Sequence, residues 1–183
     1  RAVTHLRKSW LSREILMAGL FGASWIVTAG WGWLRNATPS YGPMALLGAG
    51  LIYSMSQVYR LRAVPKWNTW RTQAAFFLSA IVLGVLGMKL FTPLLGWVWI
   101  AGVALALELG LSLSAQPAYG NLARTLRTIF LGLSALGVIL ISIFPHQLGG
   151  WMVAGVLVLA LVQEAIGRWQ FYAERVPFPA RSN

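Results

Sequence analysis

The acidic side chains of this sequence are four glutamates, and three of them lie at the edge of an apolar run or inside one. Glu14 begins the first run, and Glu108 and Glu164 each lie a few residues inside a later run. An ionised carboxylate is costly within a lipid bilayer unless it is paired, so each glutamate needs either a structural partner or a function. These three acids are therefore the first candidates for proton chemistry.

Each acid also has a structural explanation. Glu164 has Arg168 four residues later, a spacing that predicts an ion pair on one helix. Glu14 adjoins Arg13, so an ion pair explains it about as well as proton transfer does. Glu108 has no basic residue within one helical turn, and we expect it to be buried and either protonated or bonded to a neighbouring hydroxyl or amide.

A ridge of small residues accompanies Glu108 on the same segment: Gly102, Ala106 and Gly110. Small residues allow close helix packing in membranes. Because Glu108 points roughly away from this ridge, we expect neighbours on two sides of the segment.

The surroundings of Glu14 are suited to quinol chemistry. A quinol releases two electrons and two protons, and its head group needs hydrogen-bonding partners and a proton acceptor while its tail stays in lipid. Arg13, His5 and Tyr59 are within plausible reach of Glu14 and supply such groups. Spacing alone makes this a hypothesis.

The elements that carry these residues are membrane helices. The chain has 183 residues, of which 57% are hydrophobic and 10% charged, with a mean hydropathy of +0.65. Soluble domains carry about 25% charged residues. A span needs ~20 apolar residues, and six segments qualify, so we predict one all-α transmembrane bundle. The predicted spans are 12–34, 42–60, 73–91, 94–114, 125–144 and 149–171.

Positive charge marks one side of this predicted bundle. Thirteen of the 15 Lys and Arg residues lie in the N-terminal segment, the loops 60–71 and 115–127, and the C-terminal tail. The positive-inside rule places these segments in the cytoplasm. Basic residues gathered in connectors favour membrane loops over a nucleic-acid surface, so we expect a lipid bilayer and no nucleic acid as partner.

The sequence offers no ligands for a redox centre of its own. It has no cysteine, and the connectivity places His5 and His146 on opposite sides of the membrane. A thiolate-held iron–sulfur cluster and a haem held by two histidines at one depth are both disfavoured. Spacings typical of metal sites are also missing, and we expect none.

Three segments resemble the membrane anchor subunit family of dimethyl sulfoxide reductase. They are "SWLSREILMAGLFGA" (9–23), "MSQVYRLRAVPKWNTWRT" (55–72) and "EAIGRWQFYAERVPF" (164–178). The resemblance implies a bacterial or archaeal cytoplasmic membrane protein that binds menaquinol without haem. It also implies two partners, a four-cluster iron–sulfur subunit and a molybdopterin catalytic subunit.

The resemblance carries over Ser12, Arg13 and Glu14 to the quinol site. Family members look like eight-helix proteins with a His-Leu-Gly stretch and an Arg upstream of the first matching segment. We expect this chain to lack that N-terminal part, and His5 does not have the spacing of the family histidine.

The leading hypothesis is therefore an anchor subunit that binds menaquinol and passes its electrons to the iron–sulfur partner. Glu14 would accept the proton, and the loops 60–71 and 115–127 would dock the partner. The chain would be a quinol-oxidising or a non-catalytic subunit of the oxidoreductase. The alternatives are a proton- or cation-coupled transporter using Glu108 and Glu164, and a purely structural anchor without quinone.

Overall fold

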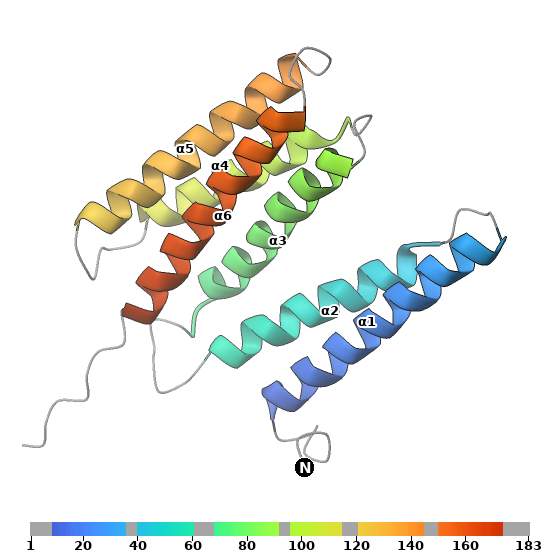
Figure 1. Ribbon diagram of the computed structural model, residues 1–183. Coiled ribbons are helices and arrows are strands. Elements are labelled where there is room, and N and C mark those ends of the chain that lie inside the picture. The colour runs from blue at the N-terminus through green and yellow to red at the C-terminus, as the bar shows by residue number, and fades with distance from the viewer. Residues whose placement is uncertain are drawn as a thin grey trace, which may run out of the picture. The chain divides into compact units, whose positions relative to one another are not determined.

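The computed structural model describes residues 9–35, 40–60, 68–91, 96–114, 121–144 and 150–173, and within these ranges every regular element is an α-helix (Figure 1). The helices are α1 (Trp10–Arg35), α2 (Gly42–Tyr59), α3 (Trp70–Phe91), α4 (Val98–Ser114), α5 (Asn121–Ile143) and α6 (Gly150–Ala173). The all-α prediction is confirmed.

The chain divides into two compact units, Arg1–Phe77 and Leu78–Asn183. The first unit holds α1, α2 and the beginning of α3. Its helices α1 and α2 pack through glycines, because a Cβ at Gly48 would lie 3.2 Å from the Phe21 ring and one at Gly50 would lie 3.5 Å from Met17 Sδ. Residue numbers rise along α2 as they fall along α1, so this pair is antiparallel.

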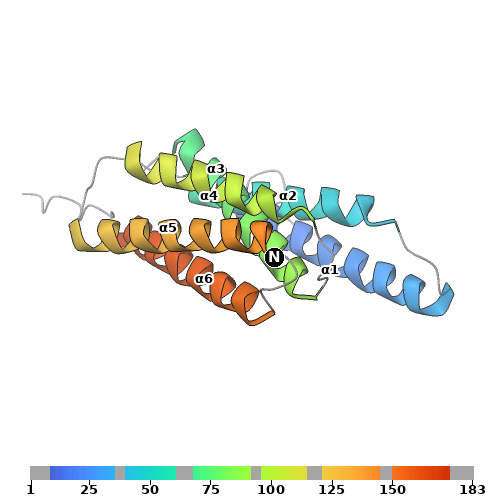
Figure 2. The same ribbon diagram turned by 90° about the horizontal axis from the view of Figure 1, so that it is seen from above.

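The second unit holds the rest of α3 together with α4, α5 and α6. Both views show α5 and α6 side by side (Figure 2). A Cβ at Gly137 would collide with Val156 Cγ2 across the α5–α6 contact, and one at Gly102 would lie 3.2 Å from Val138 across the α4–α5 contact. The apolar core draws on all four helices and includes Val82, Leu86, Ala101, Leu105, Leu131, Val138, Ile141, Val156 and Ala160.

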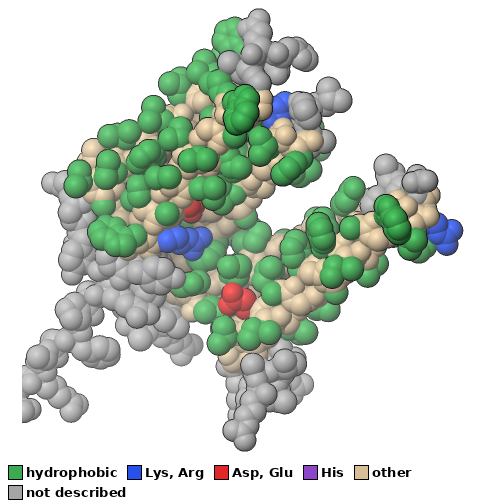
Figure 3. Space-filling model, in the orientation of Figure 1, with side chains coloured by type: hydrophobic (Ala, Val, Ile, Leu, Met, Phe, Trp, Pro, Cys, Tyr) green, Lys and Arg blue, Asp and Glu red, His purple; other side chains and the backbone are tan. Residues whose placement is uncertain are grey.

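The exposed side chains differ from those of a water-soluble protein, because large apolar residues lie outside as well as in the core. Large apolar residues lie outside, with Trp33, Phe91 and Trp151 among the most exposed, and Figure 3 shows apolar side chains over much of the visible surface. Polar residues lie inside and include Ser54, Ser56, Ser79, Glu108, Ser134 and Gln163. A surface of this kind is solvated by lipid. The protein is a multi-pass membrane protein.

The six predicted spans all occur as helices, and four of them are long and apolar enough to cross a bilayer. These are Trp10–Arg35, Trp70–Phe91, Leu122–Ile143 and Gly150–Gln170. Helix α4 is apolar but has only 17 residues. Helix α2 has 18 residues and falls outside this group, since Ser54, Ser56 and Gln57 lower the hydropathy of its second half.

Two helix starts differ from the predicted ones by four residues. Helix α4 begins at Val98 and not at 94, because Gly96 and Trp97 form a turn. Helix α5 begins at Asn121, so the later part of the predicted loop 115–127 is helical. The Leu and Arg residues of that part are good helix formers, and Arg side chains extend to the interface from a helix end.

Candidate functional site

The first candidate site lies at the beginning of α1, where a cation and two aromatic rings form a chain of contacts. The Arg13 guanidinium carbon lies 4.3 Å from the centre of the Trp10 ring. Trp10 in turn meets Tyr53 of α2 edge-on, with ring centroids 5.9 Å apart and an angle of 78° between the planes. We call Trp10, Arg13 and Tyr53 the rim cluster. It offers aromatic surface and a delocalised cation beside each other.

Glu14 lies at the same depth as the rim cluster. Gly50 packs against Met17 across the antiparallel pair, so Tyr53, three residues after Gly50, is level with Glu14, three residues before Met17. Glu14 is half-buried, and within the described ranges no ion pair joins it to a basic side chain. A carboxylate, a guanidinium, a phenol and an indole therefore lie near one level of the α1–α2 pair.

The other predicted members of this site have different positions. Ser12 is buried on α1. The Tyr59 ring packs on Phe76 of α3, with centroids 5.3 Å apart, and not on a ring of the rim cluster. His5 lies outside the described residues. Tyr53 was missed by the sequence reasoning, although a tyrosine within an apolar segment was a signal for it.

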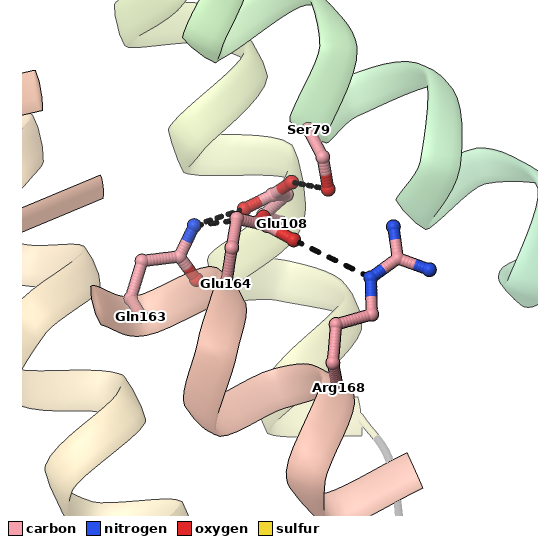
Figure 4. A network of polar contacts seen from close by, with 5 residues as sticks. All are labelled: Ser79, Glu108, Gln163, Glu164 and Arg168. Carbon is pink, nitrogen blue, oxygen red and sulfur yellow. Dashed lines mark hydrogen bonds and ion pairs between the residues drawn. The ribbon is translucent and has the colours of Figure 1, made fainter. Parts of the chain in front are cut away.

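The second candidate site is a buried polar network around Glu108 (Figure 4). Ser79 Oγ of α3 donates a hydrogen bond to Glu108 Oε1 at 3.2 Å, and Gln163 Nε2 of α6 donates one to Glu108 Oε2 at 3.1 Å. The same nitrogen bonds Glu164 Oε1 at 2.8 Å. Glu108 is 2% exposed and Gln163 is completely buried. One amide thus contacts two carboxylates in the core of the second unit.

Arginines flank this network. Arg168 Nε lies 4.0 Å from Glu164 Oε2, which confirms the ion pair predicted from their spacing. The Arg127 guanidinium lies against α6 at Gly167, where a Cβ would come within 2.8 Å of its Cζ. Arg127 also lies near enough to attract the Glu108 carboxylate. Glycine at position 167 therefore makes room for a cation beside the two acids.

The prediction that Glu108 bonds a neighbouring hydroxyl or amide is confirmed, because it does both. The prediction of neighbours on two sides of α4 is confirmed, since Glu108 bonds α3 and α6 while Gly102 meets α5, but the small-residue ridge is covered only in part. Gly102 does pack against Val138, but Ala106 and Gly110 are exposed in the second unit. The buried stripe of α4 is the one that carries Glu108 itself, together with Val98, Ala101, Ala104 and Leu105.

A comparison with protein families decides the identity of the chain. A model of the family described as "DMSO reductase anchor subunit (DmsC)" matches residues 1–98, which is more than half of the sequence. The chain belongs to the DMSO reductase anchor subunit family. Searches of the curated proteins and of the solved structures found no match.

Family membership makes this chain a membrane anchor subunit of a DMSO reductase complex. The matched part of the anchor subunit contains α1, α2 and α3, and with them the rim cluster and Glu14. Glu108, Gln163 and Glu164 lie beyond it. The two candidate sites thus differ both in their structural unit and in their relation to the family match.

Proposed function

We propose that this anchor subunit binds menaquinol at the rim cluster and passes its electrons to an iron–sulfur partner. The observation that carries the proposal is the half-buried Glu14, level with Arg13, Trp10 and Tyr53 on the helix pair that the family match covers. These groups suit a quinol head. The rings can pack on its aromatic plane, the guanidinium and the phenol can bond its oxygens, and the carboxylate can accept a proton.

Quinol oxidation releases two electrons and two protons, which must leave in different directions. The electrons pass to the iron–sulfur clusters of the partner subunit and from there to a molybdopterin catalytic subunit. Glu14 accepts the two protons one after the other and releases each of them to water at the N-terminal end of α1.

One side of the protein carries the N-terminal segment, the loops 60–71 and 115–127, and the C-terminal tail. This positively charged side is proposed to face the cytoplasm of a bacterium or archaeon and to dock the iron–sulfur subunit. Trp70 at the start of α3 and Leu122 at the start of α5 are each exposed within their own unit. The docking surface proposed for loops 60–71 and 115–127 therefore includes helical residues at its edges. Residues 61–67 and 115–120 lie outside the described ranges.

The experiment is to replace Glu14 by Gln in the whole complex and to measure turnover with a menaquinol analogue. Loss of a positioned proton acceptor slows such a reaction by at least ~100-fold. Assembly, followed by co-purification of the partner subunits, is expected to be unchanged, as is turnover with an artificial reductant that bypasses the anchor.

Glu108→Gln is the matched control, because it makes the same change from acid to amide in the other unit. It is expected to retain quinol-driven turnover. Normal turnover in the Glu14→Gln complex would remove Glu14 from the mechanism.

A further inference from the structure

Two carboxylates lie unusually close together in the second unit. Glu108 Oε2 and Glu164 Oε1 accept hydrogen bonds from the same Gln163 nitrogen, at 3.1 and 2.8 Å, so the two oxygens lie within about 6 Å of each other. An ionised carboxylate only accepts hydrogen bonds. Two ionised carboxylates this close repel each other, so the arrangement favours one ionised acid and one protonated acid, and the protonated one can donate a hydrogen bond.

Among the described residues, the basic groups around the pair form an ion pair with Glu164 but none with Glu108. Of the helices packed around the acids, α6 presents Arg168, which lies 4.0 Å from the outer oxygen of Glu164 and is partly exposed. Helix α5 presents Arg127, whose buried Nε has no hydrogen-bond partner among the described residues. Arg124 of α5 bonds the Leu113 carbonyl oxygen, and α3 presents the neutral Ser79. The hydrogen bonds that Glu108 accepts come from neutral donors, Ser79 and Gln163.

A further atom of the network is a buried oxygen that needs a hydrogen-bond donor. Gln163 is completely buried, and its Oε1 has no hydrogen-bond partner in the described part of the chain. A buried carbonyl oxygen requires a donor, and an ordered water molecule is the usual one. Gly167, one turn further along α6, lies under the Arg127 guanidinium, whose Nε also lacks a partner. Two buried polar atoms without partners among the described residues, Gln163 Oε1 and Arg127 Nε, thus lie between the carboxylates and the C-terminal end of α6.

We propose that Glu108 and Glu164 form a proton-binding site, supplied through a water molecule held at the Gln163 carbonyl oxygen. One proton leaves a hydronium ion at the basic end of α6 and forms an O–H bond on one carboxylate, and the other carboxylate accepts that hydrogen. No electrons are transferred. The site lies outside the family match and is independent of the quinol site proposed above.

Infrared spectroscopy of the full chain in lipid vesicles tests this site directly. At neutral pH, where exposed glutamates are ionised, the wild type is expected to show the carbonyl stretching band of a protonated carboxylic acid. Glu108→Gln is expected to abolish the band, and Glu14→Gln is expected to retain it. Ser79→Ala removes a hydrogen bond from Glu108 and is expected to shift the band. Gln163→Leu is expected to slow its hydrogen–deuterium exchange several-fold.

Several results would overturn the proposal. One is a wild type without the band at neutral pH. A second is a band that survives Glu108→Gln and also keeps its frequency in Ser79→Ala. If the wild-type band is missing and the carboxylate frequencies change when sodium replaces potassium, the site binds a metal cation in place of the proton. If Glu108→Gln does not fold, judged by helical circular dichroism, the Ser79→Ala shift decides.

Discussion

Glu14 and Glu108 are both acids within apolar helices, but their surroundings differ. Glu14 is half-buried beside a guanidinium and aromatic rings, whereas Glu108 is enclosed and held by a hydroxyl and an amide. A proton acceptor for a substrate must be reachable by that substrate, whereas Glu108 is enclosed and, in our proposal, exchanges its proton only with water. The structural setting thus supports different roles for the same residue type.

The hydrogen bond of Ser79 gives a prediction at the residue scale. Ser79→Ala leaves Glu108 without one of its donors, and we expect it to lower the free energy of unfolding by about 1 kcal/mol, as for other interhelical hydrogen bonds in membranes. The measurement is detergent-induced unfolding in mixed micelles.

Ser142→Ala is the control in the same unit. The Ser142 hydroxyl bonds the Val138 carbonyl oxygen of its own helix at 2.8 Å, and its loss should cost less than about 0.5 kcal/mol. Equal effects of the two variants would contradict the structural role given to Ser79.

At the scale of the elements, glycines determine how closely helices approach. Gly137 lies where α5 meets Val156 of α6, and a Cβ at this position has no room. Valine on a helix has one strongly preferred rotamer, so Val156 adapts poorly. We expect Gly137→Ala to lower the free energy of unfolding by about 1–3 kcal/mol, measured in the same mixed-micelle assay.

Two further variants make this prediction specific. Gly132→Ala changes the same helix at a position where a Cβ would have open space, and it should cause no loss. Val156→Ala should rescue Gly137→Ala, because it removes the colliding methyl group. A destabilised Gly132→Ala, or a failure of rescue, would show that the close approach is not the cause.

The helix bounds were largely predictable, because long apolar runs between Pro- and Gly-containing turns identify spans. The residues that complete the two candidate sites could not be predicted from the sequence. Gln163 and Ser79 are 84 positions apart in the sequence, and only the packing of α3, α4 and α6 brings both to Glu108. Glu164 was assigned to Arg168 correctly because that pair is local on α6, whereas the approach of Glu108 to Gln163 and Glu164 depends on the packing of α4 against α6.

At the scale of the whole molecule, the asymmetry of positive charge predicts the orientation. The sequence has no cysteine, so single cysteines report accessibility without background. Ser40, before α2, and Ser114, at the end of α4, are both exposed and are predicted to face opposite sides.

A membrane-impermeant maleimide tests this orientation. Applied to spheroplasts, it should label Ser40→Cys and not Ser114→Cys, and inverted membrane vesicles should give the reverse result. Labelling of both positions from one side would contradict the predicted topology.

The central proposal is that this anchor subunit binds quinol as well as holding its partners at the membrane. The most direct measurement is quenching of a fluorescent quinone analogue by the purified complex. We expect saturable quenching by the wild type and clearly weaker binding in the Arg13→Gln complex, because the guanidinium of the rim cluster is lost. A complex that assembles fully and shows no saturable quenching would make the chain a structural anchor without a quinone site.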